Sequence, residues 1–541
     1  MAVSQNPAGR GSLSSPPRCP EQIRLLTLNC WGLLHISALR SPRILEIGRR
    51  IAAMDAPPDV VCFQELFCQE DFQALRRETG TILPHAKFYH SGAFGAGLAI
   101  FSRWPITSSS MVPYQLNGRP TAFWRGDWYV GKGIACATIR FGPGPRDVLE
   151  VFNTHTHAPY EKGPKDTYVC HRTAQAWQMA KLVRSAVQTG HLVAALGDFN
   201  MLPSSLAHRI ITARGGVRDV WRIFHPDSSL GPSDHPDEAR RGLPVPSADF
   251  NLLENGATSN NVLNTWRWTK SEQKKLSAGD LCPVDPDTPD PRGQRLDYIF
   301  VSTGQSPDAV ESSEGDGPRS GWVVESANVA MTERHPDLLV SLSDHFAVTA
   351  TLTRHTSSTP RDPSAATPTT LESDYDAQLR YAASNDHHED KTLSRSEYTS
   401  ILAMIFWYAS RERSQRHWRG VHFYSALVVW VACLVAVWFS PRNFVAFILM
   451  LFGSVVLLAG FIDGLLALLF FSWEIRALKE FEWEVLNSQP PAPAVTDPMA
   501  VWSVGREIRT SISLVCFLSP FRVHLSVFLG IHGSVIYIIL T

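Results

Sequence analysis

The stretch "VAALGDFNML" (193–202) begins with four apolar residues and then passes through Gly197 to Asp198 and Asn200, which stand on either side of Phe199. A short apolar run bounded by turn-forming residues is typical of a buried strand. Burying a carboxylate and an amide costs free energy unless they have partners. In open α/β sheets, ligands commonly bind where strands end. The stretch therefore predicts a sheet-centred core with a site at its strand ends.

The same pattern extends over most of the chain. "IRLLTLNCW" (23–31) and "DVVCFQEL" (59–66) have the pattern of strands, and the amphipathic "SPRILEIGRRIAAM" (41–54) between them has that of a helix. Such alternation continues to "HFAVTATLTR" (345–354). Residues 21–354 are therefore expected to form one α/β catalytic domain.

Composition narrows the class of protein. The 541 residues include 50 Lys and Arg against 51 Asp and Glu, so the basic excess common in nucleic-acid binders is missing. Nine cysteines contain no C-x-x-C pair, which fits neither a disulfide framework nor a zinc cluster. A reducing compartment is the simplest interpretation, and no nucleic-acid partner is expected.

The regions outside the catalytic domain differ in composition. Residues 1–20 are rich in Ser, Pro and Gly without the apolar core of a signal peptide, so we expect a disordered leader. Residues 355–395 form a polar tract that cannot bury a core, which predicts a disordered linker. A basic juxtamembrane segment (400–419) follows. The tail at 473–541 has no assigned structure, and its apolar stretch 511–540 is left open.

Two apolar runs predict a transmembrane hairpin. Residues 423–439 and 444–462 carry no charge, and each is long enough to cross a hydrocarbon layer about 30 Å thick. Buried core helices are the alternative, which the polar linker disfavours by separating the runs from a partner core. Basic residues flank both runs, so we expect an integral membrane protein whose catalytic domain faces the cytoplasm. The endoplasmic reticulum and mitochondrial membranes are both open alternatives. The basic stretch 411–419 is either this topological signal or an attractant for anionic lipid.

Polar side chains recur at the ends of the predicted strands. Taken singly, an Asn or Asp after a strand is usually a turn former, and a lone His is usually structural. Several of them in one chain are hard to explain in this way, so we expect them to share a site. The residues are Asn29, Glu65, Asn153, His155, His157, Asp198, Asn200, Asp297, Asp344 and His345.

This ordered series resembles the endonuclease/exonuclease/phosphatase superfamily over about residues 23–353. The resemblance implies a DNase-I-like four-layer α/β (α+β) sandwich, with two stacked β-sheets flanked by helices. It implies that Glu65, with Asn29 and Asp344, holds a Mg²⁺ ion, for which Mn²⁺ is the alternative. Carboxylate and amide oxygens are the ligands that Mg²⁺ prefers.

The resemblance also implies the catalytic roles. Asp198 and Asn200 would contact the scissile phosphate and the attacking water, and Asp297 would orient His345. A histidine with a buried Asp partner is well suited to accept a proton from water at neutral pH. His155 would then donate to a phosphoryl oxygen or to the leaving group, although His157 has the same parity along a strand. The reaction expected is hydrolysis of a phosphate ester by water.

Four blocks narrow the resemblance to the neutral sphingomyelinases, and within them to the fungal inositol phosphosphingolipid phospholipases C with two C-terminal spans. They are "NCWGLL", "GRPTAFWRGDWYVGKGIACATI", "NTHTHAPYEKGPKDTYVCHRTAQAWQMA" and "SNNVLNTW". This implies a phospholipase C that releases ceramide and a phosphorylated head group from phosphosphingolipids.

The stretch "GDWYVGKG" (126–133) does not predict ATP binding, because Gly133 replaces the hydroxyl residue of a P-loop. In the family it is called P-loop-like, and Asp127 and Lys132 match its Asp and Lys. These two residues, with Asn153 and His157, are the candidate substrate-binding groups. A solvated lysine in a hairpin is the alternative for Lys132.

Two other functions stay open at this point: a Mg²⁺-dependent nuclease of the same fold, and an inactive membrane-anchored scaffold. By analogy with relatives, phosphatidylserine or cardiolipin are candidate activators of a membrane sphingolipid hydrolase. The choice between inositol and choline head groups is not decided, because the loops at 225–247 and 304–321 show the weakest resemblance.

Overall fold

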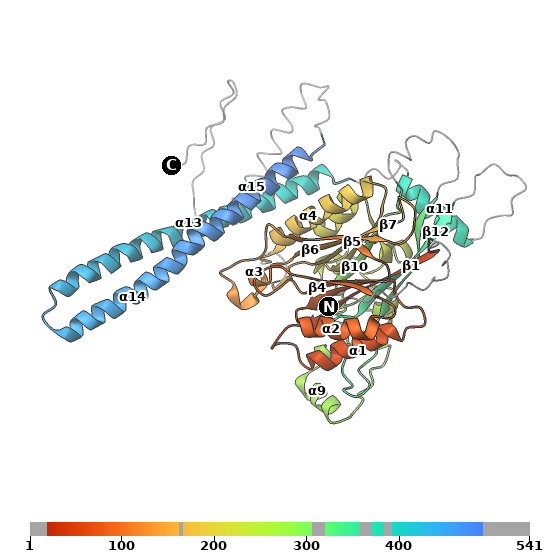
Figure 1. Ribbon diagram of the computed structural model, residues 1–541, viewed down its shortest axis with the longest axis horizontal. Helices are drawn as coiled ribbons and strands as arrows, with labels where there is room; N and C mark the ends of the chain where they lie inside the picture. The colour runs from red at the N-terminus through yellow and green to blue at the C-terminus, as the bar shows by residue number, and fades with distance from the viewer. Residues whose placement is uncertain (1–18, 162–165, 306–319, 357–369, 384–391, 491–541) are drawn as a thin grey trace, which may run out of the picture. The chain divides into compact units, whose positions relative to one another are not determined.

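Two six-stranded mixed sheets form the centre of the protein, as a computed structural model shows (Figure 1). The structure describes residues 19–161, 166–305, 320–356, 370–383 and 392–490. The first sheet has the order β11 (Ser320–Ala330), β12 (Ala347–Thr356), β1 (Gln22–Gly32), β2 (Val60–Leu66), β4 (Leu98–Ser102) and β3 (His85–Tyr89). The second has the order β5 (Ile106–Pro113), β6 (Gly133–Arg140), β7 (Val148–His155), β8 (Leu192–Asp198), β10 (Asp297–Val301) and β9 (Arg218–Asp219).

Strand periodicity builds the layers, because successive side chains point to opposite faces of a sheet. In β8, Leu192, Ala194 and Leu196 pack between the two sheets, whereas Val193 and Ala195 pack on the outer side. All five are buried, so each face of this strand meets another layer. The opening stretch is therefore a central strand, as its apolar run predicts.

Helices cover the outer faces of both sheets (Figure 1). Ile44, Ile47 and Ile51 of α1 pack on the first sheet together with residues of α2, and Trp177 of α4 packs on the second. This is the four-layer sandwich that the sequence predicts. The helices of the sandwich are α1 (Arg40–Ala52), α2 (Gln69–Thr79), α3 (Asp127–Val130), α4 (Val169–Gln188), α5 (Leu206–Arg209), α6 (Val220–Phe224), α7 (Pro236–Ala239), α8 (Ala248–Leu253) and α9 (Lys270–Ser277), with the 3-10 turns η1 (Phe123–Arg125) and η4 (Thr265–Arg267) and the π-helical segment η3 (Ile210–Arg214).

Part of the expected linker, 355–395, is helical. α11 (Thr370–Ala383) packs on the edge strand β11, where Gln378 bonds both the backbone N–H and C=O of Val324 at 2.9 Å, and Leu379 is fully buried. An edge strand leaves backbone groups free, and α11 covers them. The expectation of a disordered linker is therefore wrong for this helix. Most of the linker's other residues, and all but the last two of the leader, lie outside the described residues.

The C-terminal segments form a helical hairpin. α13 (Arg395–Trp438) runs without a break through the expected juxtamembrane segment and the first apolar run, and α14 (Asn443–Leu465) contains the second. The turn η5 (Leu466–Phe470) and α15 (Phe471–Asn487) continue it. Both arms are long and apolar enough to cross a membrane, and their apolar windows are mostly exposed. The apolar stretch 511–540 lies outside the described residues.

Small residues and one charge cluster hold the two arms together. A Cβ at Gly460 would lie 2.3 Å from the Cβ of Ala426, so only glycine allows this approach. Nearby, Asp463 of α14 bonds both Arg419 and His422 of α13, with 2.7 Å from His422 Nδ1 to Asp463 Oδ2. A carboxylate close to an apolar span is costly unless it is paired, and this one has two partners.

The base of the hairpin packs on the catalytic domain. Ile401 and Ile405 of α13 and Phe481 of α15 join the core around Trp177 of α4, whose Nε1 also donates to Glu484 at 2.9 Å. This packing involves the expected juxtamembrane segment, whereas the two apolar runs stay mostly exposed, as a transmembrane hairpin requires. The first part of the tail at 473–541, to which the sequence assigned no structure, forms the helix α15.

Arg43 joins the end of β1 and the segment after it to the loop that precedes β12. Its guanidinium is fully buried and donates to Cys30 O (3.2 Å), Leu342 O (2.6 Å), Trp31 O (2.9 Å) and Ala38 O (2.9 Å). It also stacks on the Trp31 ring, at 4.8 Å from the centroid. Three carbonyls within residues 30–38 and the distant carbonyl of Leu342 thus share one side chain.

Replacing Arg43 with methionine is expected to lower the free energy of unfolding by about 3 kcal/mol, because buried carbonyls lose their donors. Thermal unfolding followed by tryptophan fluorescence measures this loss. Arg49→Met is the matched control, since Arg49 lies on the same helix with a side chain 57% exposed. Equal unfolding midpoints for the two variants would contradict the assigned role of Arg43.

Candidate active site

Strand alternation carries polar groups to the gap between the sheets. In β8 the residues before Asp198 with the same parity pack between the sheets, and so do those before His155 in β7 and before Asn29 in β1. The register places His155 opposite Asp198, and Asp297 of β10 opposite Asp198 on its other side. The site therefore continues the apolar inter-sheet core at one end of the sandwich.

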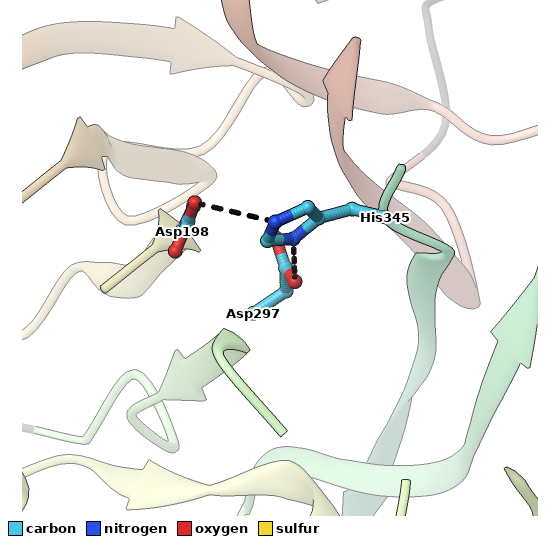
Figure 2. Close-up of side chains that lie close together, drawn as sticks. All are labelled: Asp198, Asp297 and His345. Carbon is cyan, nitrogen blue, oxygen red and sulfur yellow. Dashed lines mark hydrogen bonds and ion pairs between the residues drawn. The ribbon is translucent and has the colours of Figure 1, made fainter. Parts of the chain in front are cut away.

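A histidine between two carboxylates forms the centre of the site (Figure 2). His345, just before β12, has its Nδ1 2.8 Å from Asp297 Oδ2 and its Nε2 4.0 Å from Asp198 Oδ2. All three side chains are at least 92% buried. One ring nitrogen is thus fixed by a short hydrogen bond, and the other faces the second carboxylate, which is an arrangement suited to proton transfer.

Glu65 and His155 lie on the other side of Asp198. His155 Nε2 is 3.5 Å from Asp198 Oδ2 and 3.9 Å from Glu65 Oε1. Asn29 Nδ2 donates to both carboxylates, at 3.1 Å to Asp198 and 3.2 Å to Glu65. The structure therefore brings together members of both sheets, and the Asn29 amide nitrogen, rather than its oxygen, faces the carboxylates.

Backbone strain aims two of these side chains. Glu65 has φ 53° and Asn200 has φ 44°, a left-handed conformation that non-glycine residues seldom adopt. Strand alternation would put Glu65 on the helix-covered face with Val61 and Phe63, and the left-handed turn interrupts that alternation. Strain of this kind persists where the surroundings enforce it, often at functional sites. Asn200 N donates to Asp198 Oδ1 at 2.9 Å, which fixes the carboxylate.

The buried charges shift one another's pKa values. Burial opposes protonation of His345, but Asp297 and Asp198 outweigh it and raise the pKa of the imidazole to about 10. Burial raises the pKa of Asp198 to about 6, against the attraction of His345. Burial and the negative charge of Asp344 raise the pKa of Glu65 to about 7. The carboxylates therefore need additional positive charge to stay ionised together.

Glu65 and Asp344 fit a hard divalent cation. Glu65 Oε2 and Asp344 Oδ1 are buried without a hydrogen-bond partner among the described residues. Unpaired carboxylate oxygens that repel each other are the ligands that Mg²⁺ prefers. Asp198, Asp297 and His345 also offer ligand atoms within 4.8 Å of one another. His345 and Asp297 already bond each other, an arrangement that also suits proton transfer.

Lys132 reaches the site from the loop before β6. Its Nζ donates to Thr156 O at 2.9 Å and lies 3.9 Å from Asp127 Oδ1. The same carbonyl accepts from Asn200 Nδ2 at 3.2 Å, so Lys132 and Asn200 share an anchor. Burial lowers the pKa of Lys132, whereas Asp127, Glu65 and Asp198 oppose that change.

Two of the candidate substrate-binding residues are fully buried and lie away from the cluster around Asp198. Asn153 is fully buried and donates to Phe63 O and Ala99 O, both at 3.0 Å, so it ties the two sheets together. His157 is also fully buried, with Nδ1 3.5 Å from Asp127. Strand parity does not extend to His157 because β7 ends at His155. The structure therefore corrects both assignments from substrate contact to support of neighbouring segments.

Two residues that support the site were not found from the pattern of polar residues at strand ends. Ser343 Oγ donates to Asn29 O at 2.5 Å and so joins the loop before His345 to β1. Arg43 joins the same two segments through Leu342 and Cys30. The sequence did carry a signal for Arg43: this charged residue is spaced four residues before Ile47 and eight before Ile51, so it lies on the apolar face of the helix.

Comparison with known proteins shows which family shares this sequence. Residues 26–345 match the endonuclease/exonuclease/phosphatase family. The chain is 36% identical over 473 residues to the inositol phosphosphingolipids phospholipase C of Schizosaccharomyces pombe, covering 87% of this chain and 95% of the relative. It is 31% identical over 504 residues to the protein of the same name from Saccharomyces cerevisiae, covering 89% and 93%.

Similarity to the sphingomyelinases is more local. The chain is 32% identical over 200 residues to sphingomyelin phosphodiesterase 2 of Rattus norvegicus, which covers 37% of this chain and 46% of the relative. The match to the two yeast proteins, by contrast, extends beyond the sandwich into the helical hairpin, since it covers nearly nine-tenths of the chain. The chain therefore belongs to the endonuclease/exonuclease/phosphatase family, within the neutral sphingomyelinase group that includes the inositol phosphosphingolipids phospholipases C.

Proposed function

We propose that this enzyme is a Mg²⁺-dependent phosphodiesterase of phospholipase C type that hydrolyses phosphosphingolipids to ceramide and a phosphorylated head group. The observation that carries the proposal is the Asp297–His345 hydrogen bond of 2.8 Å, with the free ring nitrogen facing Asp198. Relatives that match almost their whole length are named inositol phosphosphingolipids phospholipases C. That likeness supports inositol-bearing lipids over sphingomyelin as the preferred substrate.

His345 accepts the proton of the attacking water in this proposal. Its Nδ1 proton is held by Asp297, so Nε2 is the atom that receives the second proton. Asp198 and Asn200 position the water, because the backbone of Asn200 fixes the Asp198 carboxylate. Asp297 and Asp198 raise the pKa of His345 to about 10, so at neutral pH its Nε2 must lose a proton before it can accept one from water. A cation at Glu65 and Asp344 would favour that loss, because the negative charge of Asp344 also raises the pKa of His345.

His155 and Lys132 act on the phosphate. Burial and the positive charges of Lys132 and His345 hold the pKa of His155 well below its usual value, so its imidazole is neutral and donates one hydrogen bond to a phosphoryl oxygen. Lys132 contributes a point charge. A Mg²⁺ ion held by Glu65 and Asp344, with Mn²⁺ as the alternative, would supply charge neutralisation at the phosphate.

The helical hairpin would hold the enzyme at the membrane that contains its lipid substrate. We propose that α13 and α14 anchor it in a membrane with the catalytic domain on the cytoplasmic side, where a lipid substrate is locally concentrated. Phosphatidylserine or cardiolipin are the proposed activators. Arg411 and Arg419 already bond Glu412 and Asp463, which leaves Arg413 and Arg416 as exposed basic residues for such lipid.

The substrate class is tested by supplying inositol phosphoceramide, sphingomyelin and duplex DNA to the full chain in detergent, each with and without Mg²⁺. We expect Mg²⁺-dependent release of ceramide, faster from inositol phosphoceramide, and intact DNA. Mass spectrometry of the lipids and electrophoresis of the DNA report the products. Cleavage of DNA alone would show a nuclease, and no cleavage of any substrate would favour the inactive scaffold.

His345→Ala is expected to lower kcat by about 10²–10⁴-fold, because a general base is lost. Asp297→Asn should produce a large part of that loss. The double variant should be no slower than His345→Ala, since Asp297 acts through His345. His191→Ala is the control, because His191 pairs with Glu150 just before β8 begins, at the other end of that strand. Losses that multiply in the double variant would refute the pairing.

Glu65→Gln is expected to raise the Mg²⁺ concentration for half-maximal activity about tenfold or more, since it removes a charged oxygen ligand. Calorimetric titration with Mg²⁺ gives a second readout that does not depend on activity. Glu161→Gln, on a partly exposed side chain paired with Arg125, serves as control. An unchanged Mg²⁺ requirement together with unchanged calorimetric affinity would remove Glu65 from the metal site.

A further inference from the structure

Three aromatic side chains are exposed on the catalytic domain: two shortly before Asp127 in the chain, and a third that contacts the same loop at Tyr129. Phe94, Phe123 and Trp124 are 68%, 68% and 71% exposed. We call these three residues the aromatic rim. Large exposed aromatics that gather on one surface mark contact with a partner or a membrane. The mechanism proposed above uses none of them.

The aromatic rim is held on an ordered framework. Phe94 contacts the Tyr129 ring at 6.0 Å between centroids, and its backbone N–H donates to Tyr129 O at 3.1 Å. The segments cross at Gly92 and Gly131, where a Cβ on Gly131 would lie 2.5 Å from Gly92 backbone atoms. Since the two loops are joined this tightly, they present the aromatic side chains in fixed positions.

The apolar surface continues onto the helical hairpin. Trp128, in the same loop as Trp124, meets Phe470 edge-on at 4.9 Å between ring centroids. Around Phe470, Leu469 is 58% exposed and Trp473 is 68% exposed. These residues lie beyond Asp463 in the chain, on the side toward the catalytic domain. The apolar surface of the membrane-crossing arm thus reaches the loop that carries the rim.

The position of the rim indicates what it contacts. Tryptophan and phenylalanine favour the boundary between head groups and acyl chains, and surfaces that continue a membrane span meet the same bilayer. The loop between Trp124 and β6 also carries Lys132, which bonds Thr156 O beside the catalytic residues. A rim seated in the boundary therefore brings the lysine that serves the site close to lipid phosphates.

We infer that the aromatic rim inserts into the surface of the same bilayer that the hairpin crosses, and so orients the active site toward lipid head groups. This inference rests on the proposed function. The occupant is a lipid surface, because the rim continues the exposed apolar surface of the hairpin at the Trp128–Phe470 contact. Anchoring by the hairpin holds the enzyme at the membrane, and the rim sets which part of the domain faces it.

The first test compares the full chain with Phe123→Ser/Trp124→Ser in vesicles of phosphatidylcholine, phosphatidylserine and inositol phosphoceramide. A short-chain, monomeric analogue of the same lipid is the second substrate. We expect the ratio of vesicle to monomer activity to fall about tenfold in the variant, while Phe224→Ser, a 40% exposed phenylalanine on α6, leaves it unchanged. An unchanged ratio in the double variant would overturn the inference.

The second test detects insertion directly and needs no activity. Brominated phospholipids quench tryptophan fluorescence within the bilayer, so the difference between the full chain and Trp124→Phe isolates the quenching of Trp124. We expect Trp124 to be quenched in brominated vesicles. Absence of that difference would show that the rim stays out of the lipid.

These results separate the inference from the proposed function. If the unaltered chain hydrolyses neither lipid substrate while Trp124 is quenched, the proposed function fails and the membrane contact stands. If the unaltered chain hydrolyses both and Trp124 is not quenched in brominated vesicles that contain no other protein, the function stands and the inference fails, leaving a protein partner as the occupant of the rim.

Discussion

The face-to-face packing of two sheets is the constraint on which the rest of the structure depends. Each central strand is buried on both faces, so its parity assigns every side chain either to the inter-sheet core or to a helix-covered face. Asp198, His155 and Asp297 belong to the inter-sheet parity and stand where that core reaches the strand ends. The polar groups of the site are thus held by the same packing that stabilises the fold, and a register shift of one residue would turn them away.

This position has an electrostatic consequence. Four buried carboxyl groups, those of Glu65, Asp198, Asp297 and Asp344, surround one imidazole with little water to screen them. The pKa of His345 rises to about 10 while that of Glu65 rises to about 7, so protons alone partly balance the cluster. A cation at Glu65 and Asp344, as proposed, would be the other way to balance it, and it would compete with protonation of the same oxygens. The fold therefore makes proton transfer and cation binding interdependent.

Strand-end chemistry could be predicted from the sequence because it follows local periodicity. The apolar run before Asp198 and the runs before Asn29, Glu65 and His155 each showed a strand ending in a polar group. Three-dimensional partners could not be predicted in this way. Arg43 meets four carbonyls from two distant segments, and Asn153 was assigned to substrate although it ties β7 to β2 and β4.

The polar composition of residues 355–395 also led to a wrong prediction for α11, again because the partner of the segment is set by the tertiary structure. α11 contains enough polar residues to resemble a linker. In the structure, however, Gln378 hydrogen-bonds the backbone of Val324 on the edge strand β11, and Leu379 is fully buried. Propensity and composition describe average environments, whereas a strand edge is a specific partner that only the tertiary structure supplies.

A buried polar contact makes the hairpin more than a tether. Tyr408 of α13 donates to Glu474 of α15 at 2.7 Å and accepts from Arg119 at 3.2 Å, all three being largely buried. Breaking such a network leaves uncompensated buried charge, which is strongly destabilising. Arg119 belongs to the loop that ends in Lys132, so the helices of the hairpin are bonded to the segment that carries the proposed phosphate-binding lysine. If the hairpin crosses a membrane as proposed, these same bonds would fix the orientation of the catalytic domain relative to the lipid.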